Sequence, residues 1–266
     1  ATLFHLCPNM VLLTRQEDQT LILTLSDPAT RNSLSPQAVA AAVEALDRAD
    51  GDPGIRAVIM RGDGAHFCAG GDLNRIGGAR SRPPEAQAES IELFHGLIDS
   101  LRSCSKPVIA AVEGFAAGGG LSLALACDLI VAAKDARFVM SYARVGLSPD
   151  GGSTWHLARA LPRALALELI WLAEPQTAER LHHLGVVNRL AEPGQALAQA
   201  LAVARQLAGM APNAVASVKE LVQQAPERSL PEQLRAERDA FVANLFHDNG
   251  GEGLAAFFGK RKPDFK

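Results

Sequence analysis

The sequence predicts an α/β fold in which strands and helices alternate, followed by a region made only of helices. Three observations favour this fold. β-Rich apolar runs alternate with longer segments of helical periodicity through most of residues 1–194. Three consecutive glycines, Gly118 to Gly120, follow one apolar run and open a predicted helix. Beyond Gly194 the apolar residues recur only at helical spacing, which predicts a separate helical subdomain over residues 195–266.

The first predicted unit is a strand, a helix and a second strand. TLILTLS at 20–26 forms the first strand and ends at the turn-like DPATRN. Ser35 and Pro36 suit a helix N-cap and a first helical position, so a helix is expected through residues 38–49. DGDPG at 50–54 breaks this helix before the strand at 55–61. This order of elements favours parallel pairing of the two strands.

The later elements continue the alternation. Residues 77–90 are polar and contain prolines, so we expect them to form a connection beside a binding cleft. A helix is predicted directly after this connection, at 91–104. Further strands are expected at 107–112, 128–132 and 186–190, and further helices at 153–160, 163–174, 177–184, 196–210, 213–225 and 230–247.

Composition excludes several classes of protein. The chain has 266 residues, 48% of them hydrophobic, which suffices for a sizeable core. Its net charge is −3, and it has no basic tract that could follow a nucleic-acid backbone. No run reaches the ~18 apolar residues of a membrane span, and the first residues lack the basic start of a signal peptide. We therefore expect a cytoplasmic protein that binds neither nucleic acid nor membrane.

The four cysteines indicate neither a disulfide framework nor a metal site. Cys7, Cys68, Cys104 and Cys127 form no close CxxC pair and have no histidines at zinc-site spacing. A reduced compartment is the simpler interpretation. Cys68 is expected to be a small buried thiol, because no nearby residue would activate it.

Two glycine-containing segments suggest a site for a negatively charged oxygen. PVIAAVEGFAAGGGLSLALACDL at 107–129 places glycines at the start of a helix, where N–H groups have no partner within the helix. FCAGGDL at 67–73 likewise follows an apolar strand and ends in small residues. Together, two such segments can hold one carbonyl oxygen from two sides as it becomes negative. The alternative for either segment alone is an ordinary tight turn.

These segments resemble the signature of the crotonase superfamily, the enoyl-CoA hydratase/isomerase group. The resemblance covers nearly the whole chain in the expected order. It includes DPATRNSLS at 27–35, FCAGGDL, IAAVEGFAAGGGLSLALACDL, FVMSYARVGLSPDGGSTWHLARALP at 138–162, AERLHHLGVVNRL at 178–190 and EGLAAFFGKRKPDF at 252–265. It implies a spiral core of repeated strand, strand and helix turns with an acyl-CoA site, and helices that assemble trimers or dimers of trimers. Coenzyme A would be part of the substrate, and no separate cofactor is implied.

The resemblance also implies roles for particular residues. The N–H groups of Gly71 and Gly119 would stabilise a thioester enolate; for Gly119 the alternative is a glycine needed only for close packing. Hydratases of the family use two glutamates, and the matching positions here are Ser122 and Tyr142, which cannot act as carboxylate bases. Both could still line the acyl pocket, or could pack in the core.

Asp150 is the candidate that replaces the missing glutamates. It lies where family members that isomerise double bonds or open an epoxide ring carry a carboxylate. One carboxylate is enough to remove a proton beside the carbonyl and return it further along the acyl chain. The alternative is an N-cap for a helix starting at Gly151 or Gly152, and the two roles do not exclude each other.

Further positions match the family's coenzyme A contacts. Arg31 matches a basic position beside the nucleotide, with a solvated surface arginine as the alternative. Lys260 matches a C-terminal position that reaches the nucleotide, often from a neighbouring subunit, but it could also belong to a charged tail. The other expected contacts are Ser33, Ala69, Asp72, Leu73 and Phe257.

The preferred activity is isomerisation of an enoyl- or ring-acyl-CoA, with Asp150 as acid and base. Residues 138–162 are most similar to isomerases of aromatic-acid breakdown that convert a ring-epoxide phenylacetyl-CoA to an oxepin. One alternative is an enoyl-CoA hydratase or ring-opening hydrolase that adds water. Another is a catalytically silent member that binds acyl-CoA or serves as an assembly subunit; the intact glycines argue against it.

Overall fold

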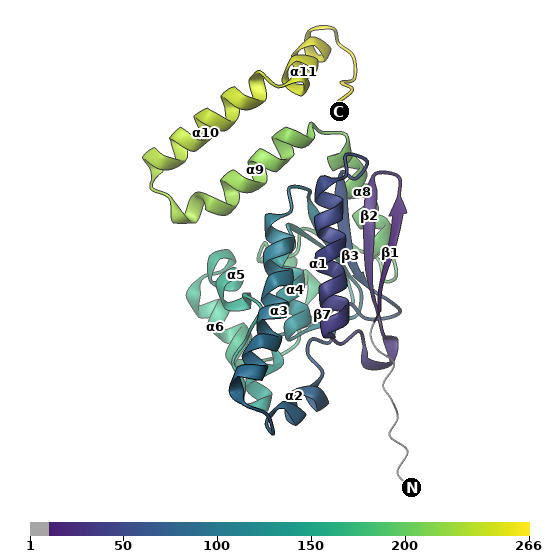
Figure 1. Cartoon of the computed structure of the whole chain (residues 1–266), viewed down its shortest axis with the longest axis vertical. Helices are drawn as coiled ribbons and strands as arrows, with labels where there is room; N and C mark the ends of the chain where they lie inside the picture. The colour runs from purple at the N-terminus through teal and green to yellow at the C-terminus, as the bar shows by residue number, and fades with distance from the viewer. Residues whose placement is uncertain (1–10) are drawn as a thin grey trace.

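The computed structural model describes residues 11–266, which form a twisted sheet covered by helices on both faces (Figure 1). The sheet has six strands in the order β1-β2-β3-β4-β6-β9. β1 pairs antiparallel with β2, and every later neighbour pairs parallel. The strands of this sheet are β1 (Val11–Glu17), β2 (Thr20–Ser26), β3 (Ala57–Gly62), β4 (Val108–Val112), β6 (Leu129–Ala133) and β9 (Arg189–Ala191). The α/β class and the parallel pairing predicted from the strand and helix alternation are confirmed.

A second, three-stranded sheet has the order β5-β7-β8. Its strands are short: β5 (Phe115–Ala117), β7 (Arg137–Val139) and β8 (Gln176–Thr177). β5 follows β4 after the turn at Glu113 and Gly114 and leads into the glycine-opened helix α4 (Gly119–Ala126). The chain thus makes a strand, strand and helix turn at the centre of the molecule, as the family resemblance implies. The sequence periodicity had not predicted this sheet, because its strands have only two or three residues.

Helices α1 and α3 cover one face of the large sheet, and α8 covers the other. Strand residues that point to opposite faces enter different apolar clusters, as the period of two requires. The helices are α1 (Pro36–Gly51), α2 (Leu73–Ala79), α3 (Pro84–Ser103), α5 (Ser153–Ala160), α6 (Arg163–Leu172), α7 (Ala178–His183), α8 (Ala196–Ala208), α9 (Pro212–Gln224), α10 (Leu230–Leu245) and α11 (Asp248–Phe258), with short 3₁₀ turns at Pro28–Thr30, Ser141–Val145 and Ala225–Glu227.

The predicted polar connection at 77–90 is wrong. Most of that stretch is helical, because α2 ends at Ala79 and α3 begins at Pro84. Proline is well suited to a first helical turn, and Glu85 follows it in that turn, where the helix dipole favours a negative charge. The prolines therefore start the helix instead of marking a loop. Strand β1, helix α2 and helix α11 were likewise not predicted from periodicity.

The chain after residue 194 begins with a helix on the sheet and continues in helices away from it. Helix α8 packs on the sheet through Ala196, Ala200, Leu201 and Ala204, which are buried against strand residues such as Ile59 and Val131. Its small side chains allow the helix to approach the sheet closely. The helices that stand apart from the sheet begin with α9, and α9, α10 and α11 form an arm at one end of the molecule (Figure 1).

Glu113 fixes the start of α8. Its carboxylate accepts hydrogen bonds from the N–H of Gly194 at 3.0 Å and of Ala196 at 2.8 Å. Ala196 is the first residue of α8, and the preceding Gln195 makes no side-chain cap. A carboxylate from the β4–β5 turn thus satisfies N–H groups that have no partner within the helix.

Lys219 joins α9 to the core. Its ammonium group donates to the Asp128 carboxylate at 2.8 Å and to the carbonyl of Leu101 at 3.1 Å. Asp128 also accepts from the N–H of Val108 at 2.7 Å. Burial raises the pKa of Asp128, and Lys219 and the Val108 N–H oppose this shift. The ion pair is largely shielded from solvent, with exposed fractions of 10% and 21% for the two side chains.

Replacing Lys219 with methionine is expected to lower the free energy of unfolding by about 3 kcal/mol, because it leaves a buried carboxylate without its cation. Chemical denaturation of the wild type and the variant measures this loss. The double variant Asp128→Asn with Lys219→Met removes the stranded charge and should recover part of the stability. A double variant no more stable than Lys219→Met alone contradicts this explanation.

Among residues 11–266, no helix is both long enough and apolar enough to cross a membrane.

Candidate active site

The two glycine-containing segments lie side by side in the structure. The N–H of Cys68 donates to the carbonyl of Phe115 at 3.1 Å, and the N–H of Ala117 donates to the carbonyl of Cys68 at 2.9 Å. The packing at the next residues leaves no room for a side chain: a Cβ on Gly70 would lie 2.8 Å from the N atom of Gly119. The main chain around Gly71 is therefore packed directly against the first turn of α4.

Gly119 and Gly120 are glycines for different reasons. A Cβ on Gly120 would lie 2.2 Å from the carbonyl oxygen of Cys68, so this position requires glycine. A Cβ on Gly119 would make only ordinary contacts, at 3.5 Å or more, with the side chains of Leu34, Phe94 and Tyr142. Close packing therefore does not require a glycine at position 119. Its absent side chain leaves space in the cavity described next.

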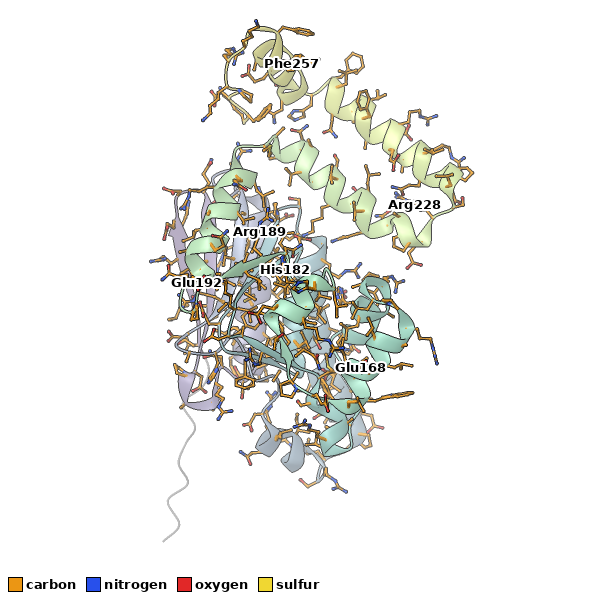
Figure 2. The ribbon with its side chains drawn as sticks, turned by 180° about the vertical axis from the view of Figure 1, so that it is seen from behind. Glu168, His182, Arg189, Glu192, Arg228 and Phe257 are labelled. Atoms are coloured by element: carbon orange, nitrogen blue, oxygen red, sulfur yellow. The ribbon has the colours of Figure 1, made fainter. Side chains whose placement is uncertain are left out.

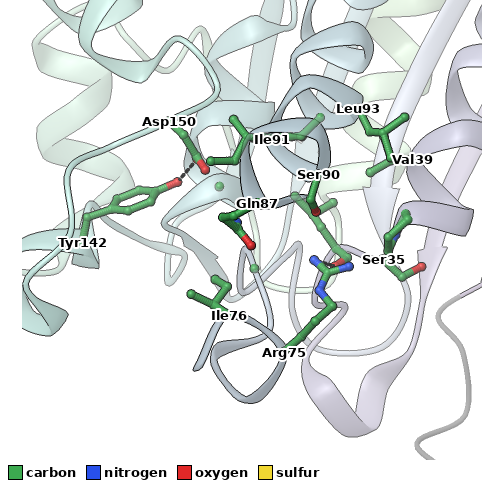
Figure 3. Close-up of a pocket in the computed structure, with 15 residues that line it drawn as sticks. Ser35, Val39, Arg75, Ile76, Gln87, Ser90, Ile91, Leu93, Tyr142 and Asp150 are labelled. Carbon is green, nitrogen blue, oxygen red and sulfur yellow. Dashed lines mark hydrogen bonds between the residues drawn. The ribbon is translucent and has the colours of Figure 1, made fainter. Parts of the chain in front are cut away.

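One cavity contains both expected donors and the expected carboxylate (Figure 3). Gly71, Gly119, Tyr142 and Asp150 all line it, and Asp150 is the only acidic residue among its lining residues. Among the hydrogen bonds formed within residues 11–266, none uses the N–H of Gly71 or Gly119 as a donor. The other lining residues are Leu34, Ser35, Pro36, Val39, Arg75, Ile76, Gln87, Ser90, Ile91, Leu93 and Phe94.

The Asp150 side chain is held by Tyr142. The phenol donates a short hydrogen bond to the Asp150 carboxylate (Figure 3). The helix that follows, α5, begins at Ser153; its N-cap is Gly152, which has no side-chain cap bond. The expected alternative of Asp150 as the N-cap of this helix is therefore wrong. The left-handed φ of Gly151 and Gly152 turns the chain between the carboxylate and the helix, so that the carboxylate faces the cavity.

Ser122 and Tyr142, at the positions of the family's two glutamates, both contact Asp150. Ser122 Oγ donates to the main-chain carbonyl of Asp150 at 2.9 Å; Ser122 is fully buried and does not line the cavity. Burial and the neighbouring Asp150 charge raise the pKa of Tyr142 well above its usual value. The phenol therefore keeps its proton at neutral pH and remains a donor to Asp150.

The expected coenzyme A contacts Arg31, Ser33 and Ala69 lie in or close to the glycine segment at 67–73. Arg31 has a left-handed conformation, and its carbonyl accepts from the N–H of Ala69 at 2.9 Å. Ser33 Oγ donates to the carbonyl of Thr30 at 2.9 Å. These residues lie next to Gly70 and Gly71 along the chain or across hydrogen bonds, but they do not line the cavity.

Asp72 and Leu73 begin helix α2. The Asp72 carboxylate accepts from the N–H of Asn74 at 2.8 Å and caps the helix. Leu73 is the first residue of α2, and 58% of its surface is exposed. Neither residue lines the cavity.

Phe257 and Lys260 lie away from the cavity. They belong to the end of α11 and the turn after it, in the C-terminal arm (Figures 1 and 2). Phe257 is 77% exposed, so within one chain it packs against little. In a single copy of the chain these two residues therefore do not complete the site that contains Asp150.

Asn32 supports the site and was not singled out from sequence. Its side chain is fully buried; it accepts from the N–H of Asp27 at 2.9 Å and donates to the carbonyls of Asp63 and His66 at 2.9 and 2.8 Å. It thereby fastens the loop after β2 to the loop after β3, which leads into the Gly71 segment. Asparagine is among the few residues that readily adopt a positive φ, here 59°. The sequence signal that could have identified Asn32 was an asparagine within the turn-like segment DPATRN.

Arg75, Gln87 and Ser90 are cavity-lining polar residues that sequence reasoning also missed. Arg75 lies on α2, which had not been predicted, and the other two lie on the part of α3 that was expected to be a loop. Recognising Pro83 and Pro84 as a helix start would have placed Gln87 and Ser90 on a helix, but it would not have identified Arg75.

On α5, Trp155 lies between two arginines. The guanidinium carbons of Arg102 and Arg159 lie 4.2 and 3.8 Å from its ring centroid. His156 packs edge-on against the same ring. Burial, together with the charges of the two arginines, lowers the pKa of His156 to about 4. His156 is therefore neutral in the folded protein at neutral pH.

This histidine gives the protein a measurable acid sensitivity. Its pKa is lower in the folded chain than its ordinary value of 6.5, so the unfolded state binds the extra proton first. The free energy of unfolding therefore keeps its full value above pH 6.5. It decreases as the pH falls toward 4, by at most about 1.4 kcal/mol per pH unit for this one histidine. Denaturation curves between pH 7 and 4.5 should show this loss, and His156→Gln should reduce it. An unchanged slope in the variant contradicts the assignment.

The cysteines within the described residues are free thiols. Cys68, Cys104 and Cys127 are buried, and burial raises the pKa of Cys68 to about 12. The expectation of an inert buried thiol at Cys68 is confirmed; Cys7 lies outside the described residues. Within residues 11–266 no group of three or more histidine, cysteine, aspartate or glutamate side chains is placed to hold a metal ion.

Comparison with known proteins places this chain in a family. The family description "Enoyl-CoA hydratase/isomerase" matches residues 15–266. The chain is 35% identical to the 1,2-epoxyphenylacetyl-CoA isomerase of Escherichia coli over 255 residues, covering 96% of this chain and 97% of the relative. It is 32% identical to the 2,3-dehydroadipyl-CoA hydratase of the same organism, with 96% and 98% covered.

Solved structures agree. An enoyl-CoA hydratase from Polaromonas sp. JS666 superposes with a TM-score of 0.95 at 57% identity and covers 96% of this chain and 100% of its own. An enoyl-CoA hydratase subunit from Geobacillus kaustophilus superposes with a TM-score of 0.89 at 35% identity, with 96% and 97% covered. With its central strand, strand and helix turn and its family match over residues 15–266, the chain has the crotonase fold and is an enzyme of the enoyl-CoA hydratase/isomerase family.

Proposed function

We propose that the enzyme isomerises an enoyl- or ring-acyl-CoA through a thioester enolate. The N–H groups of Gly71 and Gly119 hold the thioester oxygen as it becomes negative, and Asp150 moves the proton. The single observation that carries this proposal is that one cavity contains both free N–H groups and one carboxylate. Loss of one donor from a comparable site costs on the order of 3 kcal/mol of transition-state stabilisation.

The proton route follows from the contacts of Asp150. The carboxylate removes a proton from the carbon next to the thioester, and the electrons move onto the thioester oxygen between the two N–H groups. Returning the proton further along the acyl chain completes the isomerisation and restores the carboxylate. Tyr142 holds this carboxylate in place, and Ser122 holds the main chain behind it. No second carboxylate lines the cavity to activate a water molecule.

Hydration is the second candidate, because several relatives are named enoyl-CoA hydratases, including the 57% identical Polaromonas protein. In that case Asp150 alone would activate the water. For the isomerase reaction, the relative named 1,2-epoxyphenylacetyl-CoA isomerase makes a ring-acyl group one candidate substrate beside an enoyl group.

A panel of acyl-CoA thioesters incubated in deuterated water and read by mass spectrometry separates these functions. Isomerisation incorporates deuterium without the mass of an added water. Hydration adds the mass of water, and labelled solvent oxygen then appears in the product. If the protein binds acyl-CoA but exchanges no carbon-bound proton with solvent, both activities are contradicted.

A further inference from the structure

The cavity has a polar end that the proposed proton transfer does not use. Asp150 and Tyr142 lie on one side of the cavity. Arg75 and Ser90 lie on the other side and form this polar end (Figure 3). From this polar end the cavity continues into a wider groove between α2 and α3. The groove shares Pro36, Arg75, Ile76, Gln87, Ser90 and Leu93 with the cavity. An acyl group whose thioester lies between Gly71 and Gly119 can therefore extend toward Arg75.

Arg75 is held close to both proposed N–H donors through Leu34. Its Nη2 donates to the main-chain carbonyl of Leu34 at 3.1 Å. Leu34 pairs with Gly71 in a parallel bridge, and its Cδ1 would lie 3.5 Å from a Cβ on Gly119. One residue thus separates the guanidinium from each glycine.

The remaining donors of Arg75 are available to a ligand. Among the hydrogen bonds and ion pairs within residues 11–266, only the bond to Leu34 uses its guanidinium, and no carboxylate pairs with it. Gln87 and Ser90 add neutral donors on the facing helix α3. Among the lining residues of the groove, the charged ones are Arg75, Arg82 and Glu89, so the net charge of this end is positive.

We propose, on the basis of the function proposed above, that the acyl group carries a carboxylate at the end remote from the thioester, and that Arg75 binds it. A guanidinium with free donors matches a carboxylate in geometry and charge. A purely alkyl acyl group would displace water from Arg75, Gln87 and Ser90 but offer them no hydrogen bonds in return. This loss would disfavour its binding. The substrate class is therefore an acyl-CoA with a second, terminal acid group.

The test compares acyl-CoA thioesters of equal length that end in either a carboxylate or a methyl group. Calorimetric titration with the saturated thioesters measures affinity without requiring turnover. The wild type should bind the carboxylate-ended ligand at least about 10-fold more tightly than its methyl-ended counterpart, the range of a hydrogen bond to a charged group. Arg75→Met should remove this preference, with little effect on the methyl-ended ligand. Arg75→Lys, which keeps the charge, should retain part of it.

Arg80→Met is the matched control, because Arg80 lies at the end of the same helix and lines neither the cavity nor the groove. It should leave the preference intact. Equal affinities of the wild type for the two ligands overturn the proposal. Equal losses for both ligands in Arg75→Met also overturn it, since Arg75 would then contact the shared coenzyme A portion.

A failure of the proposed isomerase activity can be distinguished from a failure of the proposed carboxylate binding. In that case the carboxylate preference persists in binding, while neither unsaturated thioester exchanges its α-proton with solvent.

Discussion

Replacing Asp150 with asparagine is expected to reduce turnover by roughly 10²- to 10⁴-fold, the usual contribution of a general acid or base. Affinity for the acyl-CoA should stay within a few-fold, because the proposed oxygen contacts come from main-chain N–H groups. The variant should also fold normally. The asparagine side-chain oxygen can still accept from Tyr142, and the Ser122 bond goes to the main-chain carbonyl of residue 150. Steady-state kinetics, α-proton exchange by mass spectrometry and calorimetric binding measure these quantities.

Tyr142→Phe is the informative companion variant. It removes the donor to Asp150 but keeps the ring and the carboxylate, so it should lower turnover less than Asp150→Asn does. The carboxylate would then lack the hydrogen bond that fixes its position, so the loss should appear in turnover more than in affinity for the acyl-CoA. Activity of Asp150→Asn equal to the wild type would show that another group moves the proton.

Replacing Gly120 with alanine is expected to abolish activity and to destabilise the fold by about 3 kcal/mol or more. The added Cβ would lie 2.2 Å from the carbonyl oxygen of Cys68, a main-chain atom that cannot move aside without separating the two glycine segments. Overpacking of this kind usually costs about 1–3 kcal/mol, and more where backbone must shift. Separation of the segments also moves the N–H groups of Gly71 and Gly119 apart, which removes their joint contact with one oxygen.

Gly119→Ala provides a neighbouring control. Its Cβ would meet side-chain atoms only at ordinary contact distances, so the melting temperature should stay within about 2 °C of the wild type. The new methyl group enters the cavity beside Tyr142, so its effect should appear in substrate affinity and turnover. Thermal melts of both variants, with kinetics of each soluble protein, make the comparison. Equal stabilities for the two variants would contradict the packing explanation.

Local sequence patterns predicted the elements that have strong local signals. Ser35 accepts from the N–H of Ala38 and Pro36 begins α1, as their residue types indicated. The glycines at 118–120 open α4, and α5 has the predicted bounds of 153 and 160. These features depend on capping and backbone freedom, which neighbours in the chain decide. The prolines at 83 and 84 misled the prediction because proline starts a helix as readily as it interrupts one.

The family motifs predicted the residues of the candidate site better than their interactions. Gly71, Gly119, Tyr142 and Asp150 line one cavity, although they come from three separate motifs. The alternative of Asp150 as a helix N-cap was wrong, because the left-handed turn at Gly151 and Gly152 directs the carboxylate to Tyr142 instead. Helical periodicity predicted α8 but not its packing on the sheet, because that packing depends on the fit of its alanine-rich face to the strands.

The sequence by itself determined the family of this protein, the order of most of its elements and the residue types available for chemistry, because these follow from local patterns. Only the tertiary structure decided which of those residues meet. It placed Ser122 and Tyr142 around Asp150, and Arg75 at the other end of the same cavity. The physical reason is that such contacts join residues distant in the chain, so packing between elements, and not the preference of any one segment, brings them together.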